Sequence, residues 1–251
     1  MDRKFWDSLF ESYNSDVFDV LKSDKTKIIK KWMSEIRKTD ITVADVGCGV
    51  GKWLPYLSDR YKKVVAVDFS EPYLEHCRQE FKSLKNISYL NINMTKTQKK
   101  LKGMDLILCV NSILSNKAPE RDTYFRNLKF ALKNNGHLVL VVPSIESVLL
   151  SEYVYQAYKI KEGNIKSANQ SAASESKEFW YFKQGVVNLE NNAFTKHYLK
   201  EELISLLSRN GFMVEKIGKV EYSWDTQIEH APKSLRDPYP WDWIVLAKKK
   251  K

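Results

Sequence analysis

The sequence predicts an α/β fold in which helices cover both faces of a mostly parallel sheet. Short β-branched runs alternate with amphipathic helical segments between residues 41 and 142, and a glycine cluster joins the first run to the next helix. Regular alternation of this kind implies right-handed crossovers between parallel strands. With 251 residues and 43% apolar content, the chain can bury a full core without disulfides or metals.

Two amphipathic helices are expected in the first 40 residues, with a break at residues 14–16, where Asn, Ser and Asp follow one another. Apolar side chains recur there at helical spacing in two stripes. The first stripe comprises Phe5, Leu9, Tyr13 and Val17, and the second comprises Ile28, Ile29, Trp32, Met33 and Ile36. We expect this segment to form a helical lid over the rest of the fold.

The alternating part of the chain predicts five strands with helices between them. The expected strands cover residues 41–46, 64–68, 87–91, 104–110 and 137–142, and the expected helices start near residue 53 and cover 70–84 and 118–133. Ser70, followed by Glu71 and Pro72, is the expected N-cap of the second of these helices. The Asn-Asn-Gly sequence at 134–136 is expected to end the third as a C-cap turn.

After Pro143 the alternation stops, which indicates an insertion. We expect a helix over 145–161, a polar loop or lid over 163–178, a hairpin-like excursion over 179–195 and a helix over 198–210, followed by strands at 212–222 and 243–247. No linker divides the chain, so the sequence predicts one domain. Its parts are a helical cap (1–40), a core (41–145), an insertion (146–200) and a C-terminal helix with the last two strands (201–251).

The glycine cluster lies where a nucleotide-like cofactor binds in α/β folds. Gly47, Gly49 and Gly51 alternate with other residues between a strand and a helix, which lets the backbone approach a ligand closely. A dinucleotide fingerprint needs a glycine at position 52, and a Walker loop needs Ser or Thr after the lysine, but the sequence has Lys52 and Trp53. An acid that ends the next strand, residue 68, can accept hydrogen bonds from ribose hydroxyls.

Four segments in this order resemble motifs of the class I S-adenosylmethionine-dependent methyltransferases. They are VADVGCGVG (43–51), VAVDFS (65–70), DLILCV (105–110) and FALKNNGHLVL (130–140), which lie within residues 40–145. The resemblance implies a Rossmann-like, seven-stranded, mostly parallel sheet with helices on both faces, a helical lid and an insertion after the fifth strand. Residues 243–247 would be the antiparallel last strand. The implied cofactor is S-adenosylmethionine, with S-adenosylhomocysteine as product.

The resemblance also implies a set of cofactor-binding residues: Asp45, Gly47, Cys48, Gly49, Gly51, Asp68, Phe69, Asn93, Met94, Val110 and Asn111. The glycines would pack under the methionine part of the cofactor, an acid at 45 would orient its ammonium group and an acid at 68 would hold its ribose. Phe69 would lie against the adenine, whose edge the residues at 93 and 94 would contact. The family usually has an acid at the first of these two positions, so Asn93 is a departure. Val110 and Asn111 would lie beside the sulfonium.

Aromatic residues are frequent in the segments expected to cover the methyl acceptor. The candidate substrate-binding residues are Trp6, Tyr13, Trp180, Tyr181 and Trp224. Methyl transfer from a sulfonium is an in-line displacement that needs a general base only when the acceptor must lose a proton. The catalytic residue therefore stays unassigned, and the polar candidates are His197, His230, Glu221 and Asp225.

The formal net charge of +10 is unevenly distributed along the chain. Residues 41–145 carry 16 basic and 9 acidic side chains, whereas residues 146–251 carry 16 and 14, including a run of four terminal lysines. The part expected to bind the acceptor is thus close to neutral. Only eight arginines are present, and they are scattered, which disfavours a nucleic-acid partner.

These observations predict methyl transfer to an O or N atom of a small-molecule acceptor. The alternatives are an RNA or protein methyltransferase, and a cofactor-binding module without transferase activity. No apolar stretch is long enough for a membrane span, the start has no apolar signal region, and the three cysteines form no C-x-x-C pair. We therefore expect a cytoplasmic protein without a metal, as a monomer or homodimer.

Overall fold

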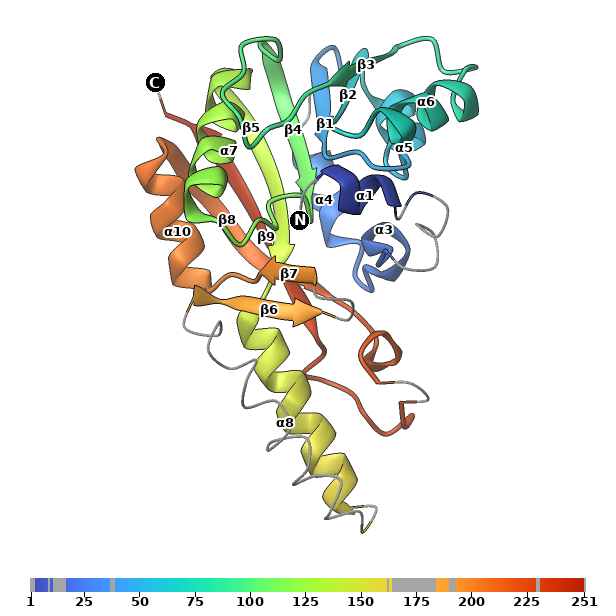
Figure 1. Cartoon of the computed structure of the whole chain (residues 1–251), viewed down its shortest axis with the longest axis vertical. Coiled ribbons are helices and arrows are strands. Elements are labelled where there is room, and N and C mark those ends of the chain that lie inside the picture. Colours follow the sequence, from blue (N-terminus) through green and yellow to red (C-terminus); the bar gives the residue numbers. More distant parts are fainter. Residues whose placement is uncertain are drawn as a thin grey trace.

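The computed structural model of the chain describes residues 3–8, 10, 17–36, 39–161, 163, 184–189, 193–228 and 231–250 (Figure 1). Its central sheet has seven strands in the order β3-β2-β1-β4-β5-β9-β8. These strands are β1 (Thr42–Val46), β2 (Lys63–Asp68), β3 (Ile87–Asn91), β4 (Met104–Val110), β5 (Leu132–Pro143), β8 (Phe212–Glu221) and β9 (Trp241–Lys249). Strands β1 to β5 pair in parallel, and β9 runs antiparallel to both neighbours. The predicted fold class is confirmed.

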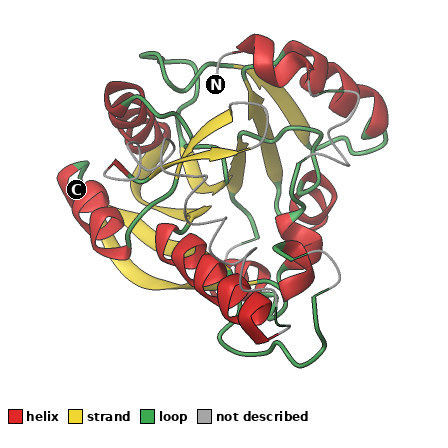
Figure 2. Ribbon diagram, turned by 60° about the horizontal axis from the view of Figure 1, so that its bottom comes forward, coloured by secondary structure: helices red, strands yellow, loops and turns green. Residues whose placement is uncertain are grey.

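Helices pack on both faces of this sheet (Figure 2). The described helices are α1 (Arg3–Ser8), α3 (Val20–Ser23), α4 (Ile28–Glu35), α5 (Leu54–Arg60), α6 (Glu71–Glu80), α7 (Ala118–Ala131), α8 (Ile145–Lys161) and α10 (Lys200–Arg209). One apolar cluster joins α4, α5 and α6 to the sheet, and a second joins α7 and α10 to its other face. Strand β2 is buried at every residue after the first, as a central parallel strand requires.

The N-terminal segment differs from the two helices that the periodicity predicts. Helix α1 ends at Ser8, Val17 lies in a bend, and the other members of the first stripe beyond Phe5 fall outside the described residues. The second expected helix is two short helices, α3 and α4. The break arises because the carboxylate of Asp24 accepts the backbone N–H groups of Ile28 and Ile29, at 3.2 and 3.1 Å, and so starts a new helix there.

The prediction of a C-cap turn at residues 134–136 is wrong. Helix α7 passes into β5 at Leu132, and the register along β4 shifts between Met104, which pairs with Leu132, and Leu106, which pairs with His137. The intervening residues therefore form a bulge, in which Asn135 adopts a φ of +62°. Asn and Gly are as suitable for a bulge as for a helix end, so the local sequence does not distinguish the two.

The segment after β5 begins with α8, which extends away from the sheet and is buried only at its start (Figure 1). A hairpin of β6 (Val186–Leu189) and β7 (Ala193–Lys196) follows within the expected range. The expected loop over 163–178 lies outside the described residues except for residue 163. The division of the chain into one domain with four parts stays a prediction. Among the described residues, no helix combines the length and the apolar character that a membrane span requires.

Candidate active site

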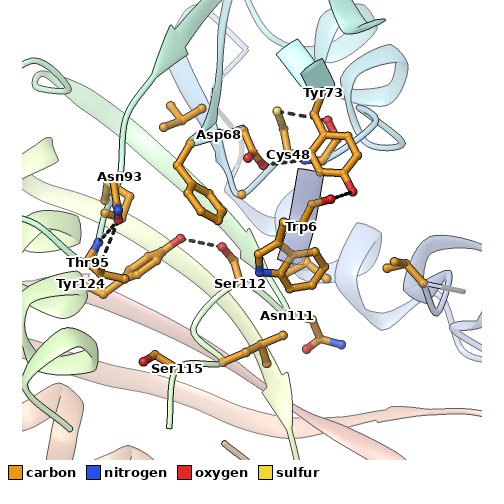
Figure 3. A pocket seen from close by; sticks show the side chains of 18 of the residues that line it. Trp6, Cys48, Asp68, Tyr73, Asn93, Thr95, Asn111, Ser112, Ser115 and Tyr124 are labelled. Carbon is orange, nitrogen blue, oxygen red and sulfur yellow. Dashed lines mark hydrogen bonds between the residues drawn. The ribbon is translucent and has the colours of Figure 1, made fainter. Parts of the chain in front are cut away.

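A cavity of about 790 Å³ opens at the carboxyl ends of the parallel strands (Figure 3). Segments that follow β1, β2, β3 and β4 line it together, as expected for a ligand site in an open α/β sheet. The predicted cofactor-binding residues at its wall are Asp45, Gly47, Cys48, Gly49, Asp68, Phe69, Asn93, Met94, Val110 and Asn111. The fold thus brings all but one of that set together.

The exception is Gly51, which faces the protein core. Its φ is +81°, and a Cβ atom built on it would lie 2.6 Å from the ring of Phe81, 2.8 Å from Leu54 and 2.9 Å from the sulfur of Cys77. A glycine is needed here because helices α5 and α6 pack tightly against the loop. The structure therefore gives Gly51 a packing role, and its contact with the cofactor stays a prediction.

The N–H groups of the glycine loop are occupied within the protein. Those of Gly47 and Cys48 both donate to the carbonyl of Val67, at 2.8 and 3.1 Å, and that of Gly49 donates to Asp68 Oδ2 at 3.0 Å. In phosphate-binding loops such groups point at the ligand instead. The loop geometry therefore argues against a dinucleotide or a nucleoside triphosphate.

The Asp68 carboxylate is held firmly at the end of β2. Besides the bond from Gly49, its Oδ1 accepts the N–H of Ser70 at 2.9 Å. Burial raises the pKa of Asp68, and the backbone N–H donors oppose that rise. Each carboxylate oxygen has two lone pairs, so both oxygens retain acceptor capacity for ribose hydroxyls.

The Asp45 carboxylate is 2% exposed, and its Oδ2 has no hydrogen-bond partner among the described residues. Burial, together with the negative charge of Asp68, raises the pKa of Asp45 to about 7. Two buried carboxylates at one end of a cavity favour a cationic ligand and repel phosphate. The ammonium and sulfonium groups of S-adenosylmethionine fit this requirement.

Asn93 follows β3, which pairs with β2, and lines the cavity. Its Oδ1 accepts both the N–H and the hydroxyl of Thr95, at 2.9 and 2.7 Å, so the amide oxygen is engaged within the loop (Figure 3). This leaves the amide nitrogen as the polar group that Asn93 offers a ligand. An acid at this position would offer an acceptor, so the departure from the family pattern changes the chemistry of the contact.

Aromatic side chains line the cavity beyond the cofactor-binding residues: Phe5, Trp6, Phe18, Trp53 and Phe194. Helix α1 contributes the first two. It is attached to the start of α6, where the Tyr73 hydroxyl donates to the Trp6 carbonyl at 2.8 Å and Ser70 Oγ donates to Asp7 at 2.5 Å. Ser70 is at the N-cap position as predicted, but its side chain binds α1 and does not cap α6.

Three polar catalytic candidates, His197, Glu221 and Asp225, do not line the cavity. His197 is buried and hydrogen-bonded to the carbonyl of Thr195, and burial lowers its pKa to about 4. Glu221 and Asp225 lie at and after the end of β8 and do not line the cavity. Trp224 is buried and donates its ring N–H to the carbonyl of Arg236. The sequence suggested these residues only through their type.

Five candidate residues predicted from the sequence remain. Trp6 lines the cavity, as described above. Tyr13, Trp180, Tyr181 and His230 fall outside the described residues.

The structure adds cavity contacts that sequence reasoning missed. Ser112 Oγ and the Tyr124 hydroxyl are 2.6 Å apart at the cavity wall (Figure 3). Asn111 donates its Nδ2 group to Asp242 Oδ2 at 2.7 Å, and the Tyr222 hydroxyl donates to the same oxygen at 2.7 Å. Burial raises the pKa of Asp242, and these two hydrogen bonds oppose that rise. No local sequence signal joins residues so far apart along the chain.

Comparison with known proteins agrees with this site. Residues 43–136 match the family model described as a methyltransferase domain. A search among curated proteins gives no match.

Several solved structures have the same fold. A methyltransferase from Mesorhizobium loti is 16% identical, with a TM-score of 0.65 over 92% of this chain and 100% of that one. The 1,6-didemethyltoxoflavin-N1-methyltransferase of Burkholderia thailandensis, bound to didemethyltoxoflavin and S-adenosylhomocysteine, is 13% identical, with a TM-score of 0.64 over 100% and 92%. The magnesium protoporphyrin IX methyltransferase of Synechocystis, bound to S-adenosylmethionine, is 13% identical, with a TM-score of 0.60 over 99% and 95%.

At these identities the structural relatives establish the fold alone, and the matched methyltransferase-domain model covers residues 43–136 of the 251. The sheet order is Rossmann-like, and two buried carboxylates, Asp45 and Asp68, line the cavity. Residues 43–136 of the chain are similar to a methyltransferase domain, and the solved structures that share its fold include S-adenosylmethionine-dependent methyltransferases.

Proposed function

We propose that the chain is an S-adenosylmethionine-dependent methyltransferase that methylates an O or N atom of a small molecule by in-line displacement. The observation that carries the proposal is the cavity of about 790 Å³, which continues from the cofactor-binding residues to an aromatic wall. A volume in this range suits a cofactor together with a small acceptor. Two of the structural relatives described above are named for small ring compounds that they methylate, which supports the same class.

The cofactor contacts follow from the chemistry of the cavity wall. Asp68 binds the ribose hydroxyls, and the unpartnered oxygen of Asp45 attracts the ammonium group. Phe69 and Met94 pack against the adenine, and the Asn93 amide donates a hydrogen bond to its edge. When bound, S-adenosylmethionine supplies an electrophilic methyl group on a sulfonium with a good leaving group.

The protein's part in the reaction is alignment and exclusion of water. Helix α1 and the hairpin residue Phe194 line the cavity beyond the cofactor-binding residues, so an acceptor would be held between apolar surfaces. Fixing two reactants in line can supply roughly 7–11 kcal/mol of the barrier reduction. An aromatic wall favours a flat or apolar acceptor over an extended nucleic-acid strand, which would need a basic groove.

A screen for the methyl acceptor tests the proposal. The protein is incubated with S-adenosylmethionine labelled at the methyl group and, in parallel, with a metabolite extract, total RNA and a protein extract. We expect label in the metabolite fraction. Label confined to RNA or to protein would contradict the small-molecule assignment and favour the macromolecular alternatives.

The role of Asp68 has a separate test. Asp68→Ala removes the charged acceptor for two ribose hydroxyls, and each such hydrogen bond contributes about 1.5–3 kcal/mol. We expect the dissociation constant of S-adenosylmethionine, measured by calorimetry, to rise by roughly 100-fold or more. Asp59→Ala, which removes an exposed aspartate of α5, is the matched control and leaves binding unchanged. Equal affinities of the two variants would refute the ribose contact.

A further inference from the structure

The two ends of the central sheet differ in charge. Strands β1 to β5 and β8 all start at one end, where the antiparallel β9 finishes, and the cavity opens at the other (Figure 1). At the first end, we consider the first residue of each starting strand, the three residues before it, and the described residues 249 and 250 of β9 and beyond. These positions carry nine basic side chains and one acidic one.

The cavity end has the opposite sign. The last residue of each of the same strands and the three residues after it, with residues 238–241 at the start of β9, are all described. They carry four acidic side chains and no basic one. We call the other end of the sheet the basic end, and its basic residues are Arg60, Lys62, Lys63, Lys85, Lys102, Lys129, Arg209, Lys249 and Lys250.

Helix ends account for part of the charge at the basic end. Helices α5, α7 and α10 finish there, and Arg60, Lys129 and Arg209 lie in their last turns. A cation at that position offsets the partial negative charge of the last helical carbonyl groups. The other six basic residues are all lysines and lie outside the helices. Helix capping therefore does not explain them.

These lysines are only partly neutralised by acids. Lys62 pairs with Asp40, the acidic residue of this end, at 2.6 Å. Lys63, Lys102 and Lys250 are exposed and form no ion pair within the part of the chain that the structure describes. Like charges gathered on one surface repel one another, which costs stability in the absence of a counter-charge. Such a surface is suited to a partner with negative charge.

The extent and chemistry of the basic end indicate the kind of partner. Its charges extend from β3 to β8, across all seven strands, which is roughly 30 Å at about 4.8 Å per strand. Lysine is a point charge on a flexible stem and suits a broad fluid surface, whereas fixed recognition of phosphates and bases favours arginine. Phe130 lies beside Lys129 in the last turn of α7 and is 46% exposed. An exposed aromatic ring among lysines is typical of contact with a lipid headgroup layer.

We propose that the basic end, together with Phe130, docks on an anionic phospholipid surface. The contact is peripheral: lysine side chains reach the lipid phosphates, and the ring of Phe130 enters the headgroup layer. In this orientation the cavity faces away from the bilayer, so that ligands reach it from solution. The inference goes beyond the proposed function and does not depend on it.

The test measures how the full chain partitions onto lipid vesicles. Equimolar phosphatidylcholine and phosphatidylglycerol supply an anionic surface, and phosphatidylcholine alone supplies a neutral one. We expect the protein to sediment with the anionic vesicles at physiological salt and to stay in solution with the neutral ones. Equal binding to both kinds of vesicle, or binding to neither, would overturn the proposal.

A triple variant tests whether the basic end makes the contact. Lys63→Gln, Lys102→Gln and Lys250→Gln remove three exposed charges there. Each lysine close to an anionic bilayer contributes about fivefold to partitioning, so we expect the partition coefficient to fall roughly 100-fold. Replacement of the same three lysines by arginine keeps the charge and should preserve vesicle binding.

A second triple variant is the matched control. Lys27→Gln, Lys161→Gln and Lys233→Gln remove three exposed lysines that lie before α4, at the end of α8 and in the loop before β9, outside the basic end. Its net charge equals that of the first variant. We expect this control to bind anionic vesicles within a few fold of the wild type, and its thermal unfolding shows whether it is folded. Equal losses in the two variants would mean that net charge alone drives binding, which would refute a docking face.

Phe130 distinguishes a lipid surface from a nucleic acid. Phe130→Ala should weaken binding to anionic vesicles by about fivefold to tenfold, because the ring no longer leaves water. Leu149→Ala removes a similarly exposed apolar side chain from α8, 47% exposed, and should have no effect. Total RNA is the second probe. If the first triple variant loses RNA binding while Phe130→Ala binds vesicles as the wild type does, the basic end serves nucleic acid and the proposal fails.

Discussion

Two buried carboxylates at the ends of adjacent strands determine what the cavity binds. Asp45 and Asp68 are 2% and 7% exposed, and the nearby loop N–H groups are occupied by Val67 and by Asp68 itself. A site with negative charge, in which the N–H groups of Gly47, Cys48 and Gly49 are engaged within the protein, disfavours phosphate and favours a cation.

This electrostatic arrangement predicts a pH dependence of cofactor binding. In the proposed function the ammonium group of the cofactor binds the ionised form of Asp45, whose pKa burial raises to about 7. Binding at lower pH must first remove that proton, so affinity should fall roughly 20-fold between pH 7.5 and 5.5. Calorimetry with S-adenosylmethionine over this range measures the effect, and the window stays below pH 8, where the cofactor's own amine begins to titrate.

Asp45→Asn should bind the cofactor more weakly and without this pH dependence. The folding stability of the ligand-free protein depends on pH with the opposite sign. Because the pKa of Asp45 is raised in the folded protein, the stability that this carboxyl contributes is present below about pH 4 and is lost as the pH rises through 7. If the affinity of Asp45→Asn for the cofactor changes with pH as steeply as that of the wild type, another group causes the pH dependence of binding.

Gly47 is required for two separable reasons, which a pair of variants can distinguish. Gly47→Ala places a Cβ 2.0 Å from Ser112 Oγ and also puts alanine at a φ of +79°. Gly103→Ala has nearly the same φ, +77°, with nothing within 4 Å of the new Cβ, so it measures the backbone cost alone, about 1–2 kcal/mol. We expect Gly47→Ala to lose at least ~1 kcal/mol more in urea unfolding. Equal losses would mean that Ser112 moves aside freely.

At the scale of elements, α1 is a short helix at the cavity wall that is hydrogen-bonded to the start of α6. It has six residues and is joined to the start of α6 by the hydrogen bonds of Tyr73 and Ser70. A helix this short is not stable by itself in water, so its position over the cavity depends on these contacts and on packing. The same element contributes Phe5 and Trp6 to the cavity wall.

Loss of one of these contacts should speed release of the cofactor. Tyr73→Phe removes the hydroxyl that binds the Trp6 carbonyl, a net contribution of about 0.5–1.5 kcal/mol. We expect the dissociation rate of S-adenosylhomocysteine, measured by stopped flow, to rise by about twofold to tenfold. Tyr89→Phe is the matched control, because its hydroxyl binds the Cys77 carbonyl in α6 and does not contact α1. Equal rates in both variants would argue against a role of α1 in retention.

At the scale of the whole molecule, part of the excess positive charge lies at the end of the sheet opposite the cavity, where the parallel strands begin. Lys63 begins β2, Lys102 lies just before β4, and Lys250 follows the antiparallel β9. All three are exposed. Along β2 the distance from Lys63 to Asp68 is roughly 16 Å, five steps of about 3.3 Å. That is about twice the Debye length of about 8 Å at physiological salt.

Substitution of these lysines should therefore leave the cofactor site unaffected. The variant with Lys63→Gln, Lys102→Gln and Lys250→Gln lowers the formal net charge from +10 to +7 (10 − 3). Calorimetry at 0.15 M salt should give an affinity for S-adenosylmethionine within about twofold of the wild type. A tenfold change would show that charge at this edge acts on the cavity over a longer range than screening allows.

The sequence predicted the elements well where their signals are local. The strand at Met104–Val110 and the helix at Ile145–Lys161 have the expected bounds, because apolar period and flanking prolines or glycines define them within a few residues. It failed where a tertiary contact competes with the local pattern. Asp24 divides the expected second helix, and pairing with β4 draws residues 133–136 into a bulge instead of a turn.

The amino-acid sequence by itself determined the α/β alternation, the glycine loop and the acids that end β1 and β2, since turn chemistry and periodicity act between near neighbours. Only the tertiary structure decided which of these residues face the cavity. It turned Gly51 to the core, moved His197 away from the cavity and brought Asn111 to Asp242 across 131 positions of the chain. Contacts of that separation depend on strand order, which no short stretch of sequence encodes.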